Sequence, residues 1–170
     1  MIDPNRICYR CMTPLADANA PCPNCGTTRA SLNNEDDQLP IGSILAGKYL
    51  VGCALGQGGF GITYIGWELN LGRKLAIKEY YPDVFVKRNR ATRATVLAYT
   101  GEKAAYFQRG REKFVEEAQT LARFATDPGI VSVHDFFNES GTAYIVMDYV
   151  EGRTLKQLAR ERGGKLPAGE

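Results

Sequence analysis

The sequence lacks several features that would place it in common classes of protein. No apolar run approaches the roughly 18 residues that a membrane span needs, so we expect no membrane segment in this chain. Residues 1–4 are neither basic nor followed by an apolar core, so no signal peptide is expected. A formal net charge of +2 gives no bulk attraction to nucleic acid, which is not expected as a partner. These absences favour a cytoplasmic protein.

What is present is ordinary for a globular chain of one or two domains. The 170 residues are 44% hydrophobic and 24% charged. Their distribution is uneven, however, because four of the five cysteines lie within the first 25 residues. The N-terminal segment therefore needs an explanation of its own.

The four cysteines form two Cys-x-x-Cys pairs with ten residues between them. Each pair lets two thiolates face one ion from a tight turn, and two pairs complete a tetrahedron. A segment of about 25 residues cannot bury enough apolar surface to fold without such a staple. We predict a small zinc ribbon over residues 1–26, with disulfides or a redox pair as the alternative. The predicted metal ligands are Cys8, Cys11, Cys22 and Cys25.

The role of this ribbon is open on sequence grounds. Such a module can bind nucleic acid, bind protein or only hold the N-terminus in shape. It carries Arg6, Arg10 and Arg29 against Asp3 and Asp17, which is too little positive charge for a nucleic-acid face. We therefore expect a structural role or a protein partner at the ribbon.

The next segment, residues 27–40, is polar and acidic with almost no apolar content, which predicts a flexible linker. A lobe is expected over residues 41–150. It contains the fifth cysteine, Cys53, which we interpret as a small buried strand residue, with a reactive thiol as the alternative. The only histidine, His134, is expected to be a hydrogen-bonded strand residue, because the four cysteines already complete a metal site.

A glycine-rich stretch is the most informative feature of the lobe. Gly56, Gly58 and Gly61 form Gly-x-Gly-x-x-Gly, and Lys78 follows 17 residues later. Glycines let a backbone turn lie close over phosphates, and a lysine supplies a compact cation. A dinucleotide fold would need a helix after the glycines, but residues 62–67 are β-branched and aromatic and predict a strand. The motif therefore indicates a hairpin, with a second strand at residues 74–78.

Five segments of the chain, in this order, resemble the protein kinase family. The glycine hairpin is similar to the nucleotide lid of the family, and Ala76-Ile77-Lys78 resembles its Val-Ala-Ile-Lys motif. Residues 114–121 resemble helix C, residues 128–131 the turn after it, and residues 143–152 the fifth strand and hinge. The wording of the glycine loop and the long insert after Lys78 look most like bacterial serine/threonine kinases.

This resemblance implies an α+β fold. It would be a kinase-type N-lobe, with a five-stranded antiparallel sheet plus helix C, preceded by the small four-Cys zinc ribbon. The implied function is the ATP-binding half of an enzyme that transfers the γ-phosphate of ATP to hydroxyls of a protein substrate. The implied cofactors are ATP with Mg²⁺, in addition to Zn²⁺.

The resemblance also implies the residues that bind ATP. An apolar roof would cover the adenine, the glycine loop would cover the phosphates, and Lys78 would hold the α- and β-phosphates. Met147 would stand at the gatekeeper position, and the Asp148 carbonyl and Val150 amide would bond to the base. One departure from the family pattern is Thr63, which replaces the usual valine and can still cover a base. The full predicted set is Leu55, Gly56, Gln57, Gly58, Gly59, Phe60, Gly61, Thr63, Ala76, Lys78, Met147, Asp148 and Val150.

Apolar residues at three- and four-residue spacings predict a helix over residues 106–125. Glu117 shares the apolar face with Phe114, which aims it toward the sheet and Lys78. By the resemblance, Lys78 and Glu117 are the catalytic pair that aligns the phosphates. The alternative is a surface pair between Lys113 and Glu117. A further helix is predicted over residues 154–162.

The insert at residues 83–105 carries the basic group Lys87, Arg88, Arg90 and Arg93. It is interpreted as a solvated loop or as a docking surface for a protein partner or an acidic substrate.

Two motifs of the family are absent from these 170 residues: the His-Arg-Asp and Asp-Phe-Gly segments that supply the catalytic aspartate and hold magnesium. We therefore expect that the chain alone does not transfer phosphate and that it is a fragment of a full kinase. In that case residues 151–170 leave the hinge and begin a second lobe. Two alternatives are a regulatory module, in which a zinc ribbon is joined to a nucleotide-sensing or partner-binding half-kinase, and a nucleic-acid-associated zinc-ribbon protein.

Overall fold

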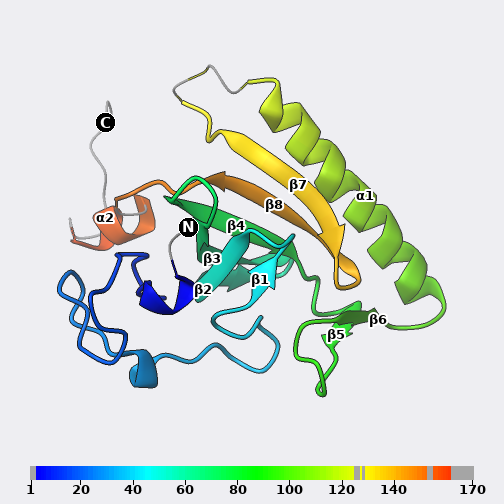
Figure 1. Ribbon diagram of the computed structural model, residues 1–170. Coiled ribbons are helices and arrows are strands. Elements are labelled where there is room, and N and C mark those ends of the chain that lie inside the picture. Colours follow the sequence, from blue (N-terminus) through cyan, green and yellow to red (C-terminus); the bar gives the residue numbers. More distant parts are fainter. Residues whose placement is uncertain (1–2, 125–126, 128, 153–154, 162–170) are drawn as a thin grey trace.

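The computed structural model describes residues 3–124, 127, 129–152 and 155–161. Its centre is one antiparallel sheet with the strand order β1-β2-β3-β4-β8-β7, and the long helix α1 (Glu102–Ala122) runs alongside β7 and β8 (Figure 1). The strands are β1 (Ile44–Leu45), β2 (Tyr49–Gly58), β3 (Gly61–Glu68), β4 (Arg73–Tyr80), β7 (Val133–Glu139) and β8 (Thr142–Asp148).

The α+β class and the sheet-plus-helix architecture are confirmed. The sheet has six strands where five were predicted, because the two residues of β1 pair with the start of β2. A tight turn makes this pairing possible: Ala46 and Gly47 both have positive φ, and the amide of Lys48 donates to the carbonyl of Leu45. The sequence pattern gives no signal for so short a strand.

The helix begins four residues earlier than predicted, directly after Gly101, and ends at Ala122. Its buried residues Phe107, Phe114 and Ala118 lie on the face that the spacing indicated. The end predicted at residue 125 lies outside the described residues. The predicted helix at 154–162 corresponds to α2 (Leu155–Glu161), and its two terminal residues also lie outside the described part.

The main core includes side chains from both faces of the sheet and from α1. Tyr64, Ile77 and Tyr144 are fully buried in it, together with Phe107 and Phe114 of the helix. The Tyr80 ring stacks on Phe107 and lies tilted against Phe114, so β4 and α1 are joined by an aromatic cluster. This contact fixes the helix next to the strand that carries Lys78.

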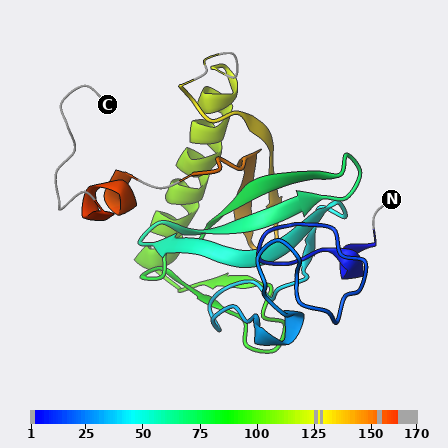
Figure 2. The same ribbon diagram turned by 90° about the vertical axis from the view of Figure 1, so that its left-hand side faces the viewer.

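The N-terminal module packs against the other end of the sheet, as Figures 1 and 2 show. It contains two short 3-10 helices, Pro4–Arg6 and Arg29–Ser31. Its residues Ile7, Tyr9 and Met12 form a second core with residues of β2 and β3, among them Leu50 and Ile65. The amide of Cys53 in β2 also donates to the Tyr9 carbonyl, 2.8 Å away.

Residues 27–40, predicted to be a flexible linker, have extensive contacts with the lobe. Leu39 is fully buried in the main core, and its amide donates to the Tyr64 hydroxyl. Asn34 and Gln38 are buried as well, and their side chains bond to β2. Composition missed these contacts because the polar side chains bond here to the backbone and to a side chain of β2 rather than to water. The domain boundaries at residues 26, 40 and 150 stay predictions.

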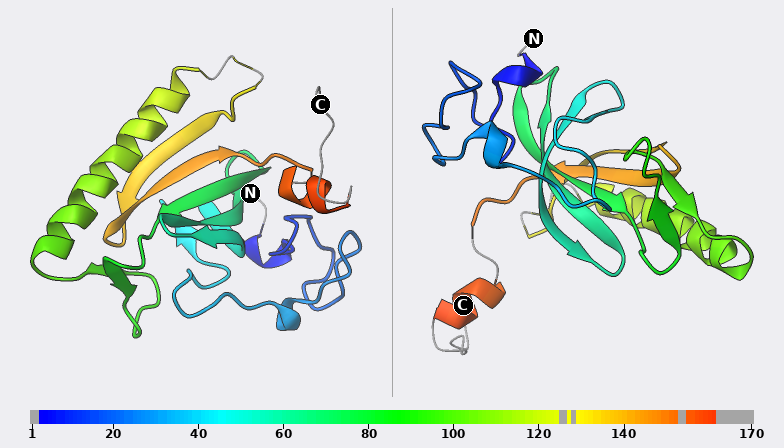
Figure 3. Two further views of the ribbon diagram at one scale, coloured as in Figure 1. Left: turned by 180° about the vertical axis from the view of Figure 1, so that it is seen from behind. Right: turned by 90° about the horizontal axis from the view of Figure 1, so that it is seen from below.

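The insert after β4 is partly ordered as a hairpin of β5 (Val86–Arg88) and β6 (Val96–Ala98). The strand β4 ends at Tyr80, two residues before Pro82, which cannot continue the ladder of hydrogen bonds. Val86 and Val96 are buried in the main core, so the hairpin is not wholly a solvated loop. Figure 3 shows it close to the first turns of α1. Within the described part of the chain, no helix combines the length and the apolar character that a membrane crossing demands.

Candidate nucleotide-binding site and metal centre

The strand register brings four of the predicted ATP-binding residues onto one face of the sheet. Thr63 pairs with Lys78 across β3 and β4, and Ala76 pairs with Met147 across β4 and β8. Directly paired residues of antiparallel strands point to the same face, and residues two apart on a strand share it. Thr63, Ala76, Lys78 and Met147 therefore lie on one face of the sheet.

The glycine loop is the tight connection between β2 and β3, where Gly58 pairs with Gly61. Gly61 needs to be glycine, because a Cβ there would overlap the backbone carbonyl of Glu79. By contrast, a Cβ at Gly56, Gly58 or Gly59 would meet open space. The loop is therefore held close to β4 at its last glycine and is open elsewhere.

Three predicted contacts of the nucleotide are strongly exposed side chains. Phe60 at the tip of the loop is 81% exposed, Val150 is 73% exposed and Leu55 is 47% exposed. Large apolar residues with this exposure are suited to contact a ligand or a partner surface. The contacts of these three residues with a nucleotide stay predictions.

The predicted catalytic pair lines one cavity but forms no ion pair. Lys78 and Glu117 both line a cavity of about 410 Å³ between the glycine loop, β4 and α1. The Lys78 Nζ lies 5.4 Å from the centre of the Phe114 ring. Among the described residues, neither Lys78 nor Lys113 has a carboxylate oxygen of Glu117 within 4.0 Å. The catalytic role of Glu117 and the alternative surface pair thus both stay predictions.

At the predicted hinge, Asp148 forms two hydrogen bonds, one with Ser132, just before β7, and one with His134 in β7. Its amide donates to the Ser132 carbonyl, and its Oδ1 lies 2.5 Å from the Nε2 of His134. The hydrogen bond with His134 lowers the pKa of the Asp148 carboxyl. His134 is therefore a hydrogen-bonded strand residue, as predicted.

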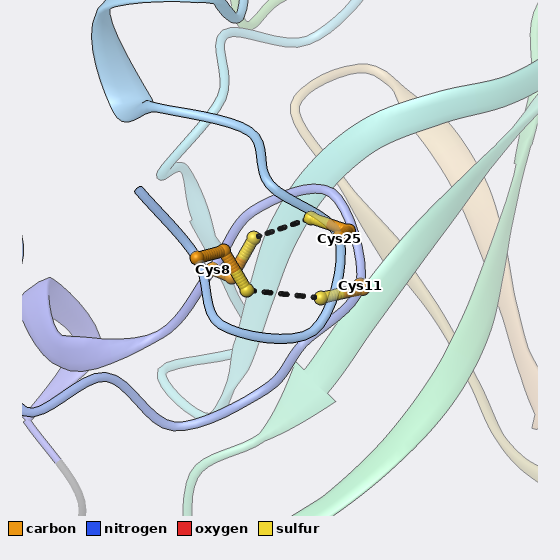
Figure 4. Close-up of side chains that lie close together, drawn as sticks. Cys8, Cys11 and Cys25 are labelled. Atoms are coloured by element: carbon orange, nitrogen blue, oxygen red, sulfur yellow. Dashed lines mark hydrogen bonds between the residues drawn. The ribbon is translucent and has the colours of Figure 1, made fainter. Parts of the chain in front are cut away.

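The four predicted metal ligands lie together in the N-terminal module. Their Sγ atoms all lie within 4.8 Å of one another, and the Cys8–Cys25 and Cys11–Cys22 pairs are each 3.6 Å apart. Figure 4 shows these two contacts, with the sulfur atoms of two loops turned toward a common centre. A disulfide has sulfurs about 2.05 Å apart, and all five cysteines are free thiols. Four thiolates around zinc, at about 2.3 Å from the ion, have sulfurs roughly 3.8 Å apart, so the arrangement fits a metal better than the disulfide alternative.

The thiols of this centre have very different acidities. Burial raises the pKa of Cys8 to about 12. Burial also acts to raise the pKa of Cys11, but hydrogen bonds with Thr13 and Asn24 lower it to about 6. Backbone geometry favours metal ligation too, since Gly26 has a φ of 70° directly after the last ligand.

A buried ion pair next to Lys78 was missed from the sequence. The carboxylate of Glu79 and the guanidinium of Arg88 lie 2.7 Å apart, with side chains 0% and 2% exposed. The hydroxyls of Tyr64 and Tyr144 also donate to Glu79. Burial raises the pKa of the Glu79 carboxyl, and Arg88 opposes this effect. One signal was available: a charged residue following Lys78 in a central strand faces the opposite side and needs a buried partner.

The other basic residues of the insert lie at the surface near the linker. Lys87, Arg90 and Arg93 line a cavity of about 540 Å³ together with Asp36 and Asp37. The two aspartates offset much of the positive charge. A docking role of the insert for a protein partner stays a prediction.

Comparison with known proteins finds relatives that are bacterial serine/threonine-protein kinases. No protein-family model matches the chain. The serine/threonine-protein kinase PknG of Mycolicibacterium smegmatis is 28% identical over 179 residues, covering 97% of this chain and 20% of the relative. The serine/threonine-protein kinase PrkC of Bacillus subtilis is 32% identical over 127 residues, covering 75% of this chain and 16% of the relative. A solved structure described as the apo form of PpkA-294 is 36% identical with a TM-score of 0.68, covering 74% of this chain and 43% of that one. The chain thus spans a fifth or less of the length of these curated relatives.

Proposed function

Because the homologues of the chain are bacterial serine/threonine protein kinases, and because its fold is that of a kinase N-lobe, we propose that it forms the ATP-binding half of such an enzyme. In this proposal the adenine lies under Leu55, Thr63 and Ala76, beside Met147 and the hinge. Lys78 holds the phosphates beneath the glycine loop. The parent protein would transfer the γ-phosphate of ATP to hydroxyls of a protein substrate.

The observation that carries the proposal is the row formed by Gly56, Thr63 and Lys78. Gly56 of β2 pairs with Thr63 of β3, and Thr63 pairs in turn with Lys78 of β4, so the three residues share one face of the sheet. The row places a flexible backbone, a β-branched side chain and an ammonium group next to one another. Such a surface can contact the base at one end and neutralise phosphate charge at the other.

We further propose that these 170 residues alone do not transfer phosphate. The reaction needs a carboxylate that orients the acceptor hydroxyl, and side chains that hold Mg²⁺. The sequence contains neither a His-Arg-Asp nor an Asp-Phe-Gly segment to supply them. The role of this chain is therefore to bind ATP and orient it, while magnesium is held mainly by other segments.

Nucleotide binding tests the proposal. Titration of the chain with Mg-ATP, followed by calorimetry, should give saturable binding that Lys78→Ala weakens about tenfold or more. Lys74→Ala is the matched control: Lys74 lies on the same face of β4 but pairs with Glu151. Equal affinities of the wild-type chain and Lys78→Ala would reject the site. Labelled γ-phosphate should not be incorporated into protein, and clear incorporation that Lys78→Ala abolishes would overturn the expected inactivity.

We also propose that Cys8, Cys11, Cys22 and Cys25 bind Zn²⁺. A bound ion would cross-link two loops that bury few apolar side chains of their own, since only Leu15 and the cysteines form the core between them. Four free thiols suit a reducing compartment, so the cytoplasm is the proposed location. Purified protein should contain one equivalent of zinc by mass spectrometry, which a Cys8→Ser, Cys22→Ser double variant should lose. Retention of metal in this variant would count against the site.

A further inference from the structure

Residues 34–39, which we call the strap, run from the N-terminal module toward the β5–β6 hairpin (Figure 1) and lie against the glycine-loop strand β2. Asn34 bonds to both the Gly52 carbonyl and the Ala54 amide. Further along, Gln38 Nε2 donates to Gln57 Oε1 at 2.9 Å, and Gln57 Nε2 donates to Asp37 Oδ2 at 2.7 Å. The strap therefore binds the loop through hydrogen bonds to both polar atoms, Oε1 and Nε2, of the Gln57 side chain.

Gln57 carries the only polar side chain of the glycine-rich loop, residues 56–61. Between Gly56 and Gly61 the loop reads Gly-Gln-Gly-Gly-Phe-Gly, so Gln57 alone can form side-chain hydrogen bonds. A Cβ at Gly56, Gly58 or Gly59 would meet open space, and Phe60 is 81% exposed. Beyond the β2–β3 ladder, side-chain hydrogen bonding in this loop thus depends on Gln57 and the strap.

The strap holds the loop from the face opposite the nucleotide. Gly56, Thr63 and Lys78 form one cross-strand row, and Gln57, Ile62 and Glu79 form the next. Neighbouring rows of a sheet point to opposite faces. The bonds to Gln57 therefore restrain the height of the loop without occupying the space where phosphates would lie.

The strap is anchored firmly enough to do this. Leu39 is fully buried, and its amide donates to the Tyr64 hydroxyl. Arg88 Nε donates to the Asp37 carbonyl at 2.7 Å, while its Nη2 binds Glu79. An unbroken series of hydrogen bonds thus leads from Gln57 through Asp37 and Arg88 to Glu79, the neighbour of Lys78.

We propose that Asp37 and Gln38 are positioning residues that hold the glycine-rich loop, through Gln57, at the height that ATP phosphates require. The inference rests on the proposed function and adds to it two residues outside the kinase-like glycine motif. They never contact the nucleotide. Their effect is confined to the part of the ligand that the loop covers, which is the phosphates and not the base.

The experiment compares an Asp37→Ala, Gln38→Ala double variant with the wild-type chain. Hydrogen exchange of the amides of residues 55–61, measured without nucleotide, should become faster in the variant. Affinity for Mg-ATP should fall about three- to tenfold, the effect of one or two lost hydrogen bonds, while affinity for adenosine stays unchanged. Asp36→Ala is the control, since this carboxylate is fully exposed and, among the described residues, forms an ion pair with Arg93 at 3.5 Å rather than a bond with Gln57. Asp37→Asn keeps an acceptor for Gln57 and should retain the wild-type affinity.

Three results would overturn the inference. One is unchanged exchange of the loop amides in the double variant. Another is an equal loss of ATP and adenosine affinity, which indicates a general structural effect. A third is a loss in Asp37→Asn as large as in the double variant. If the wild-type chain binds neither ligand, the proposed function fails, and the exchange measurement still decides separately whether the strap restrains the loop.

Discussion

At the scale of single residues, Glu79 follows Lys78 in β4 and therefore faces the opposite side of the sheet. A buried carboxylate at this position needs partners of its own. The Glu79 carboxylate points into that side, where it is fully buried. A buried carboxylate without a partner is very costly. Arg88, from the insert, and the hydroxyls of Tyr64 and Tyr144 supply the partners.

Removal of Arg88 should therefore destabilise the lobe strongly. Arg88→Leu leaves the buried Glu79 carboxylate without its counter-ion, and we expect a loss of about 3–5 kcal/mol in the free energy of unfolding by urea denaturation. Lys87→Leu, an exposed neighbour in the same hairpin, should change stability by less than about 0.5 kcal/mol. Adding Glu79→Gln to Arg88→Leu should recover part of the loss, because the buried charge is gone. Equal effects of the Arg88 and Lys87 substitutions would contradict this account.

Asp135 gives a prediction of pH dependence. Its carboxylate accepts from the Tyr49 hydroxyl at 2.7 Å and lies 3.0 Å from Lys48 Nζ. Burial acts to raise the pKa of Asp135, but these two partners lower it overall. Because the folded-state pKa lies below the usual value of about 3.9, the stabilisation is present above that pH and is lost as the pH falls through the folded-state pKa.

Asp135→Asn should cost about 1 kcal/mol at pH 6, since the group is partly exposed and screened. The difference from the wild-type chain should shrink below about pH 4. Denaturation curves between pH 3 and pH 7 measure this, with the exposed Asp83→Asn as control. A difference that stays constant over this range would show that the ion pair contributes nothing.

Strict alternation along a strand is the part of this site that a sequence makes predictable. Thr63, Ala76 and Lys78 are two residues apart or directly paired, so alternation alone puts them on one face. Sequence reasoning failed for Asp37, Gln38 and Arg88, whose partners lie 20, 19 and 9 residues away or in another element. Such contacts depend on how the linker and the insert fold back, which no local pattern encodes.

At the scale of elements, Gly110 controls how closely α1 approaches the sheet. A Cβ at this position would overlap the hydroxyl of Tyr80, whose ring is already enclosed by Phe107 and Phe114. Alanine is the better helix former by about 1 kcal/mol, so on propensity alone the substitution should stabilise the helix. The contact with Tyr80 decides otherwise.

We expect Gly110→Ala to destabilise the lobe by about 1–3 kcal/mol in thermal or urea denaturation. Tyr80→Phe removes the overlapping oxygen, so the Gly110→Ala, Tyr80→Phe double variant should be more stable than Gly110→Ala alone. A double-mutant cycle measures this coupling. Additive effects of the two substitutions would mean that the helix does not depend on this close approach.

The same elements show which parts of the fold could be predicted. The long helix and the strands on each side of the glycine loop were found because their apolar residues repeat with a clear period. The start of α1 and the pairing of β1 were missed, since Gly101 and the turn at Ala46 and Gly47 set them through backbone conformation. The β5–β6 hairpin was hidden because its buried apolar residues, Val86 and Val96, alternate with polar and charged neighbours.

At the scale of the whole molecule, the N-terminal module and the sheet share a core. Ile7, Tyr9 and Met12 pack on Leu50 and Ile65, and the cysteine cluster lies directly behind them. Composition predicted two units joined by a linker, because the sequence of neither unit shows that its apolar side chains pack against those of the other. This arrangement makes the edge of the sheet sensitive to the module.

Gly52 lies at a close contact between the two parts. A Cβ there would overlap the Tyr9 carbonyl and the end of the Met12 side chain. Gly52→Ala should therefore weaken docking of the module and lower stability by about 1–3 kcal/mol. Gly129→Ala, distant in sequence, is the control, because a Cβ there would meet one exposed carboxylate oxygen at 3.3 Å. Amide exchange should rise at Cys53, and an unchanged rate there would argue against the docked arrangement.

Metal removal tests whether the proposed zinc site supports this docking. Without an ion, the two cysteine loops retain little apolar burial of their own, so they should lose their structure. The Tyr9 carbonyl then no longer accepts from the Cys53 amide, and exchange at residues 7–15 and at Cys53 should increase by at least tenfold after treatment with a strong chelator and reductant. The amides of β4 and β8 lie in the other core, which depends on α1, and should keep their protection. Re-addition of zinc should reverse the change.

If the chelated protein keeps its protection at Cys53, the ion does not support the contact. A global loss of protection, including β4 and β8, would show instead that the module and the lobe unfold as a single cooperative unit.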